Sequence, residues 1–99
     1  MADNKELEHL RSEIDKLDMQ IVDVLNDRAK LVLKIRDVKI KRGLPRHDPE
    51  RETEVKRHIV SENNGPLPDD ALRRIYEHIL YHMRQFPENS RTDDITSDR

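Results

Sequence analysis

A long aliphatic repeat without glycine or proline constrains this chain more than any other feature of its sequence. Between Leu7 and Val38, hydrophobic residues recur at alternating spacings of three and four, the pattern of a helix that buries one seam. Nine of the ten seam positions are aliphatic, and the tenth is Arg28. The seam consists of Leu7, Leu10, Ile14, Leu17, Ile21, Val24, Arg28, Leu31, Ile35 and Val38. The repeat predicts one long amphipathic helix.

The predicted helix is too long for a compact domain of this size. It begins with Asp3 or Asn4 as N-cap and ends near Arg42, because Gly43 supplies a stop and Pro45 prevents the helix from resuming. Such a rod is about 57 Å long, whereas a compact domain of 99 residues spans roughly 35 Å. The helix is therefore either exposed along half its length or covered by another chain.

Two shorter helices follow. Asp48 is a typical N-cap and Pro49 a typical first helical residue, and this second helix should end around residues 63–65. A third helix should begin near Pro68 and end at Pro87.

These elements predict an all-α fold, since no segment alternates like a strand. We expect a helical domain over residues 1–86 and a polar, disordered tail over residues 87–99. Because the first helix needs a cover, the expected architecture is a three-helix subunit with a very long first helix, in an intertwined homodimer.

Composition excludes several function classes. Basic and acidic residues nearly balance, 19 against 21, and only three residues are aromatic, so nucleic-acid binding is not expected. The chain has no cysteine, no apolar N-terminal run and no stretch long enough to span a membrane, which predicts a cytoplasmic protein. His78 and His82 have the spacing of a metal-binding pair but lack a third ligand, so no metal is predicted.

Arg28 does not fit the aliphatic seam. A buried guanidinium must find a negative partner or keep water, because an unpaired charge is costly to bury. One interpretation is a salt bridge within the protein, for instance to Asp27 or Glu52. The other is that a negatively charged ligand occupies the seam.

Arg11, Arg28 and Lys39 are three cations on core-facing positions of the first helix. On a regular helix Arg28 and Lys39 lie about 20° apart around the axis and roughly 16 Å apart along it, so both could hold a small dianion. Arg11 is about 26 Å from Arg28, too far to reach the same ligand. An antiparallel partner helix would bring its own Arg11 to this pair, which suggests a site built from two chains.

A second charged segment, Arg46 to Glu52, covers the start of the second helix. The first turn of a helix presents free N–H groups that can bind a ligand oxygen. The alternative is that Asp48 only caps the helix while Arg51 and Glu52 are solvated.

Read in order, four short segments resemble the all-helical chorismate mutase family: "LRSEIDKLD", "LNDRAKL", "DVKIKRG" and "DPERE". The later segment "NNGPLPDDALRRIYEHIL" is similar to the third-helix region of such domains, including those fused to prephenate dehydratases. The resemblance implies an isomerase that rearranges chorismate to prephenate without a cofactor, in the shikimate pathway to phenylalanine and tyrosine. It also implies a dimer with two shared sites, and leaves room for a partner enzyme of the pathway.

The resemblance also implies a role for each matching residue. Arg28 and Arg11 of the other chain match the carboxylate clamps, and Lys39 matches the residue that holds a carboxylate and the breaking ether oxygen. The remaining matches are Glu52 as acceptor for the substrate hydroxyl, Asp48 through its backbone, and Arg51 as a further cationic wall residue.

The third helix departs from the family pattern. Met83 stands where a small or hydroxyl residue is common, and Pro87 stands where the family offers Gln or Glu to the ether oxygen. Either the end of the third helix is distorted so that Gln85 or His82 substitutes, or Lys39 acts alone. Met83 and Gln85 are the candidates on this helix for binding the substrate. Removing one such transition-state donor typically costs on the order of 10²–10³ in rate.

Two other functions fit parts of the pattern. An isochorismate–pyruvate lyase is built on a similar fold and would use the same cations, although Arg51 and Glu52 match the mutase pattern better. A non-catalytic helical dimerisation or regulatory module, completed by a partner enzyme, is favoured by Pro87.

Overall fold

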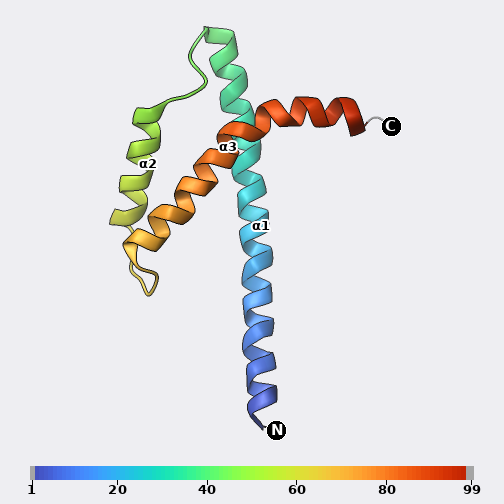
Figure 1. Cartoon of the computed structure of the whole chain (residues 1–99), viewed down its shortest axis with the longest axis vertical. Coiled ribbons are helices and arrows are strands. Elements are labelled where there is room, and N and C mark those ends of the chain that lie inside the picture. Colours follow the sequence, from blue (N-terminus) through green and yellow to red (C-terminus); the bar gives the residue numbers. More distant parts are fainter. Residues whose placement is uncertain (1, 98–99) are drawn as a thin grey trace. The chain divides into compact units, whose positions relative to one another are not determined.

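The computed structural model describes residues 2–97, with side chains for residues 4–88. It has three helices: α1 spans Ala2–Arg42, α2 spans Pro49–Ser61 and α3 spans Asp69–Ser97 (Figure 1). No strand occurs in the described residues. The predicted all-α class with a very long first helix is confirmed.

The chain divides into two compact units that are described separately. The N-terminal unit is Met1–Val32 and consists of most of α1. The C-terminal unit is Leu33–Arg99 and holds the end of α1, then α2 and α3.

Local signals set the end of α1, but not its start. Gly43 has a positive φ of 66°. Its N–H donates to the Ile40 carbonyl at 3.2 Å, and the Leu44 N–H donates to the Lys39 carbonyl at 2.8 Å, which is the Schellman arrangement that satisfies free carbonyls. The predicted stop is confirmed. The predicted caps are wrong, since α1 already begins at Ala2 and both Asp3 and Asn4 lie within it.

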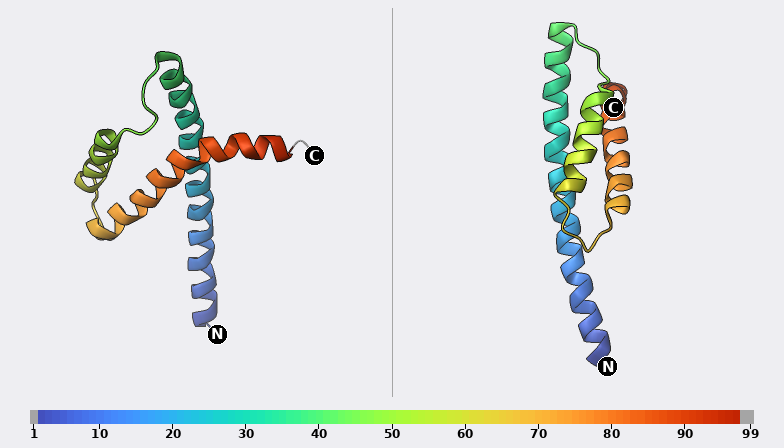
Figure 2. Two further views of the ribbon diagram at one scale, coloured as in Figure 1. Left: turned by 45° about the horizontal axis from the view of Figure 1, so that its top comes forward. Right: turned by 90° about the vertical axis from the view of Figure 1, so that its left-hand side faces the viewer.

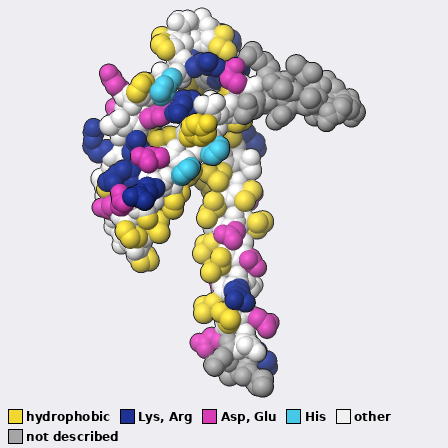
Figure 3. Space-filling model, in the orientation of Figure 1, with side chains coloured by type: hydrophobic (Ala, Val, Ile, Leu, Met, Phe, Trp, Pro, Cys, Tyr) yellow, Lys and Arg dark blue, Asp and Glu magenta, His cyan; other side chains and the backbone are white. Residues whose placement is uncertain are grey.

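The aliphatic seam of α1 is not buried in a single chain. All nine of its aliphatic residues are between 44% and 64% exposed. Figure 3 shows hydrophobic side chains at the surface along the N-terminal part of α1. Among the described aliphatic residues, Leu80 of α3 is the buried one, at 7% exposed. The single chain thus leaves its most regular apolar surface in contact with water.

In the C-terminal unit, α2 and α3 pack side by side (Figures 1 and 2). The Asp48 carboxylate accepts a hydrogen bond from the Arg51 N–H at 3.1 Å and caps α2, as predicted. The half-buried aliphatic residues of the two helices include Val55, Ile59, Leu72 and Ile79. The start of α3 falls where the sequence predicts it, and α2 ends two residues before the predicted region.

The prediction that Pro87 ends the third helix is wrong, because α3 continues through it to Ser97. Proline removes one backbone donor and crowds the preceding turn, which bends a helix but does not always end it. Figure 1 shows α3 changing direction in its C-terminal part. The domain boundary at residue 86 and the disorder of residues 87–99 stay predictions, since side chains are described only to Glu88.

Within the described part of the chain, no helix is both long enough and apolar enough to cross a membrane.

The stop of α1 yields a stability prediction. A Cβ at Gly43 would meet nothing within 4 Å, so Gly43→Ala tests the backbone conformation alone. We expect a loss of about 1–2 kcal/mol in the free energy of unfolding, because an L side chain disfavours the left-handed region. Gly43→Asn should lose less, since asparagine tolerates that region. Urea denaturation at one fixed protein concentration measures both losses, and an unchanged Gly43→Ala midpoint would contradict the assignment.

Candidate functional site

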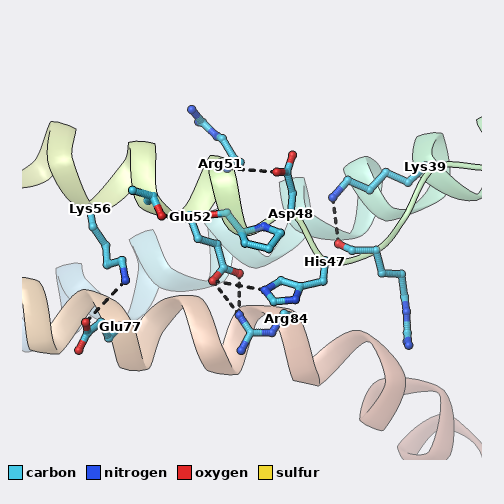
Figure 4. A network of polar contacts seen from close by, with 11 residues as sticks. Lys39, His47, Asp48, Arg51, Glu52, Lys56, Glu77 and Arg84 are labelled. Carbon is cyan, nitrogen blue, oxygen red and sulfur yellow. Dashed lines mark hydrogen bonds and ion pairs between the residues drawn. The ribbon is translucent and has the colours of Figure 1, made fainter.

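The start of α2 places Glu52 toward α3. Glu52 lies one helical turn after the Asp48 cap, and its side chain is 25% exposed. Arg84 Nη1 of α3 donates to both of its carboxylate oxygens, at 2.8 Å to Oε1 and 2.6 Å to Oε2. His47 Nε2 lies 3.9 Å from the same Oε1 (Figure 4). Glu52 is therefore not a solvated surface residue, contrary to the simpler interpretation of this segment.

Arg51 behaves differently from Glu52. Its side chain is 67% exposed and pairs with Glu54 of the same helix at 3.0 Å. Figure 4 shows it extending away from the α2–α3 interface. In the single chain Arg51 therefore has the solvated position that the simpler interpretation gives it, and a role in binding a ligand stays a prediction.

Lys39 lies in the last turn of α1, before the loop that leads to α2. It is half-buried, and its Nζ donates to the Arg46 carbonyl at 3.0 Å (Figure 4). An ammonium has three donors, so this bond leaves two for a ligand oxygen. The hydrogen bond also ties the end of α1 to the loop that leads to Asp48. Lys39 and Asp48, two of the predicted site residues, lie in the same C-terminal unit.

A second ionic cluster in the C-terminal unit was not predicted from the sequence. Glu88 Oε2 lies 2.5 Å from Arg46 Nη1 and 3.5 Å from Arg36 Nη2. Arg36 is half-buried, and its Nε is buried without a hydrogen-bond partner. Arg36 lies one turn before Lys39 on α1, so its helical spacing is a signal that could have found it. Glu88 had no such signal, because α3 was expected to stop before it.

The remaining third-helix candidates flank Arg84. Met83 is half-buried and Gln85 is exposed. Sequence reasoning selected these two and missed Arg84, although Arg84 is the α3 residue that pairs with Glu52. The substrate-binding roles of Met83 and Gln85 stay predictions.

Arg11 and Arg28 belong to the N-terminal unit. Arg11 is exposed, whereas Arg28 is half-buried and engaged in an interaction of its own. Their place beside Lys39 and Glu52 stays a prediction.

The histidine pair lies on α3, and the His82 ring meets the Tyr81 ring edge to face at 5.1 Å. His78 and His82, with Glu77 and Tyr81, line an open depression on α3. Among the described residues, no three His, Cys, Asp or Glu side chains are grouped so that they could hold a metal ion.

The C-terminal unit thus combines half-buried cations with a carboxylate held in place. Lys39 and Arg36 can bind an anionic group, and Glu52 can accept a hydrogen bond from a hydroxyl. This arrangement suits the binding of a polar anion.

Known proteins of one family resemble the chain. The family model for chorismate mutase type II matches residues 10–88. A bifunctional chorismate mutase/prephenate dehydratase from Aquifex aeolicus is 44% identical over 80 residues, which cover 77% of this chain and 22% of that protein. The chain spans less than a quarter of the length of the bifunctional relatives it matches.

Solved structures agree with the family model. A chorismate mutase from Thermus thermophilus is 33% identical with a TM-score of 0.78, covering 79% of this chain and 89% of that one. A chorismate mutase from Helicobacter pylori in complex with prephenate is 34% identical with a TM-score of 0.75, covering 87% and 93% of the two chains. The chain belongs to the chorismate mutase type II family.

Proposed function

We propose that this chain is a chorismate mutase, which rearranges chorismate to prephenate on the route to phenylalanine and tyrosine. The match of the family model to residues 10–88 carries the proposal, because that stretch includes the residues we assign to the reaction, among them Arg11, Arg28, Lys39 and Glu52. The similar Helicobacter pylori protein binds prephenate, the product of this reaction. A cytoplasmic location stays a prediction.

The proposed chemistry needs no cofactor. In this Claisen rearrangement the ether C–O bond breaks as a new C–C bond forms, and no proton is transferred. The protein must hold a flexible dianion in a compact, reactive chair, which supplies much of the rate. It must also place fixed positive charge where the ether oxygen gains electron density.

Lys39 is the residue we assign to the ether oxygen. It is half-buried, and its ammonium is a compact charge with donors to spare beyond its bond to the Arg46 carbonyl. Arg28 of the same chain would bind one substrate carboxylate, and Arg11 of the partner subunit the other. The planar fork of arginine suits carboxylates.

The start of α2 would bind the hydroxyl side of the substrate. Glu52 accepts the hydroxyl hydrogen bond, and the backbone at Asp48 assists. Arg51 would complete the cationic wall by turning from Glu54, with which it forms an exposed and therefore weak pair.

Pro87 leaves the ether oxygen with fewer donors than in the family pattern. Gln85 is exposed, and Glu88 is engaged by Arg36 and Arg46. We therefore infer that Lys39 is the main donor to the ether oxygen. A second donor is typically worth on the order of 10²–10³ in rate, so this chain should turn over more slowly than family members with Gln or Glu there.

We further propose that the working form is a homodimer. The nine aliphatic seam residues remain about half exposed in one chain, and burying apolar surface is the main favourable term in association. A second α1 running antiparallel would cover this seam and bring its Arg11 to the site. Relatives that join a chorismate mutase to a prephenate dehydratase suggest an enzyme of that class as the consumer of the product.

Purified protein incubated separately with chorismate and with isochorismate tests the function. We expect prephenate from chorismate and no pyruvate from isochorismate, because Glu52 and Arg51 match the mutase pattern. Absorbance of chorismate and a coupled pyruvate assay follow the two reactions. Pyruvate without prephenate would establish the lyase instead, and no reaction with either compound would favour a non-catalytic module.

A mixing experiment tests the shared site. Arg11→Ala and Arg28→Ala should each lower turnover by at least about 10²-fold, since each removes a carboxylate clamp. Chains mixed in equal amounts should recover about a quarter of the wild-type activity, because half of the dimers are mixed and each has one intact site.

Lys30→Ala is the matched control for Arg28→Ala. Lys30 lies two residues away on α1 with a side chain that is 76% exposed, so its removal should leave turnover unchanged. Circular dichroism of each variant should show that its helix content equals that of the wild type. Chain exchange without any recovery of activity would contradict a site built from two subunits.

A further inference from the structure

The ion pair between Arg84 and Glu52 joins α3 to α2 at the candidate site (Figure 4). We propose that Arg84 is a positioning residue, which fixes the Glu52 carboxylate so that it meets the substrate hydroxyl in a single orientation. The inference rests on the proposed function, because it takes Glu52 as the hydroxyl acceptor.

The geometry of the pair is that of a strong, partly shielded contact. One nitrogen of Arg84 donates to both oxygens of Glu52, at 2.8 Å and 2.6 Å, and charge-assisted bonds of this length are the stronger class. The side chains are 28% and 25% exposed. Water therefore screens this pair less than it screens the exposed pairs on the same helices.

Arg84 is itself supported. Its Cζ lies 5.7 Å from the centroid of the Tyr81 ring, within the range of cation–π attraction. The Tyr81 ring meets the His82 ring edge to face at 5.1 Å. The guanidinium is thus held by both an aromatic ring and Glu52, so its position does not depend on Glu52 alone.

Restraining Glu52 matters because a glutamate side chain is flexible. Its rotatable bonds would let a free carboxylate occupy several positions, and ordering it when substrate binds would cost conformational entropy. An ion pair that exists before binding removes that cost and fixes the direction of the hydrogen bond to the substrate.

The pair leaves Glu52 able to accept another hydrogen bond. An ionised carboxylate has about four acceptor positions, and Arg84 uses two of them. His47 faces the same carboxylate at 3.9 Å, beyond hydrogen-bond distance. Substrate can therefore bind without breaking the contact with Arg84.

The same two helices supply a matched control. Lys56 of α2 and Glu77 of α3 form an ion pair at 3.6 Å, and Lys56 lies one turn after Glu52. This pair also bridges α2 and α3 but does not involve Glu52. A purely structural bridge and a positioning contact can be distinguished by comparing the two.

The experiment measures kcat and KM for chorismate in Arg84→Met, Arg84→Lys and Lys56→Met. We expect Arg84→Met to lower kcat/KM by about 10²-fold, the size of effect that a displaced catalytic group produces. Arg84→Lys should recover part of this loss, because it restores the charge but not the guanidinium geometry. Lys56→Met should match the wild type, and an equal loss in Lys56→Met would overturn the proposal.

A double-mutant cycle with Glu52→Gln gives the second readout. If Arg84 acts through Glu52, adding Arg84→Met to Glu52→Gln costs little more than Glu52→Gln alone. Losses that multiply would show that Arg84 acts independently of Glu52 and would overturn the proposal. If Arg84→Met loses helix content, the cycle is read with Arg84→Lys.

The result for the wild-type chain distinguishes a failure of this proposal from a failure of the proposed function on which it rests. A wild-type chain that forms no prephenate overturns both. An active wild type with multiplying losses in the cycle overturns only the positioning role of Arg84 and leaves the function in place.

Discussion

Helix α1 carries more apolar surface than its own chain can cover, and the rest of the structure depends on this constraint. Nine aliphatic seam residues are about half exposed, and a single aliphatic residue, Leu80, is buried among those described. A helix of this length in a domain of this size cannot curl back on itself, because no glycine or proline interrupts the seam. The seam therefore lacks a cover, which we propose a second copy of the chain supplies. That second copy would explain why the proposed site takes one arginine from a partner subunit.

Within the C-terminal unit, guanidinium groups pair with two carboxylates of the candidate site and its surroundings. Glu52 is held by Arg84, and Glu88 is held by Arg46 and Arg36. The Lys39 ammonium donates instead to a backbone carbonyl, which is an uncharged acceptor. The proposed dianionic substrate would then compete for Lys39 with an uncharged backbone carbonyl.

Local signals in the sequence predicted most of the fold. The stop at Gly43 and the cap at Asp48 each depend on a few neighbouring residues, so the sequence alone places them. Arg84 and Glu88 were missed because their contacts are set by helix packing: Arg84 lies 32 positions from Glu52, and Glu88 lies 52 positions from Arg36. Pro87 misled the prediction since a proline raises the cost of a helix without always ending it. The proposed meeting of Arg11 and Arg28 at one site would depend on a second chain, whose placement no local pattern specifies.

The most direct test of a shared electrostatic site is a crystal structure with a bicyclic dicarboxylate that mimics the reactive chair. The account predicts one such molecule at each of two sites in a symmetric dimer, with Arg28 and Lys39 of one chain and Arg11 of the other on its charged oxygens. Glu52 should contact its hydroxyl while still paired with Arg84. An inhibitor bound wholly within one chain, with the partner's Arg11 in solvent, would contradict the account.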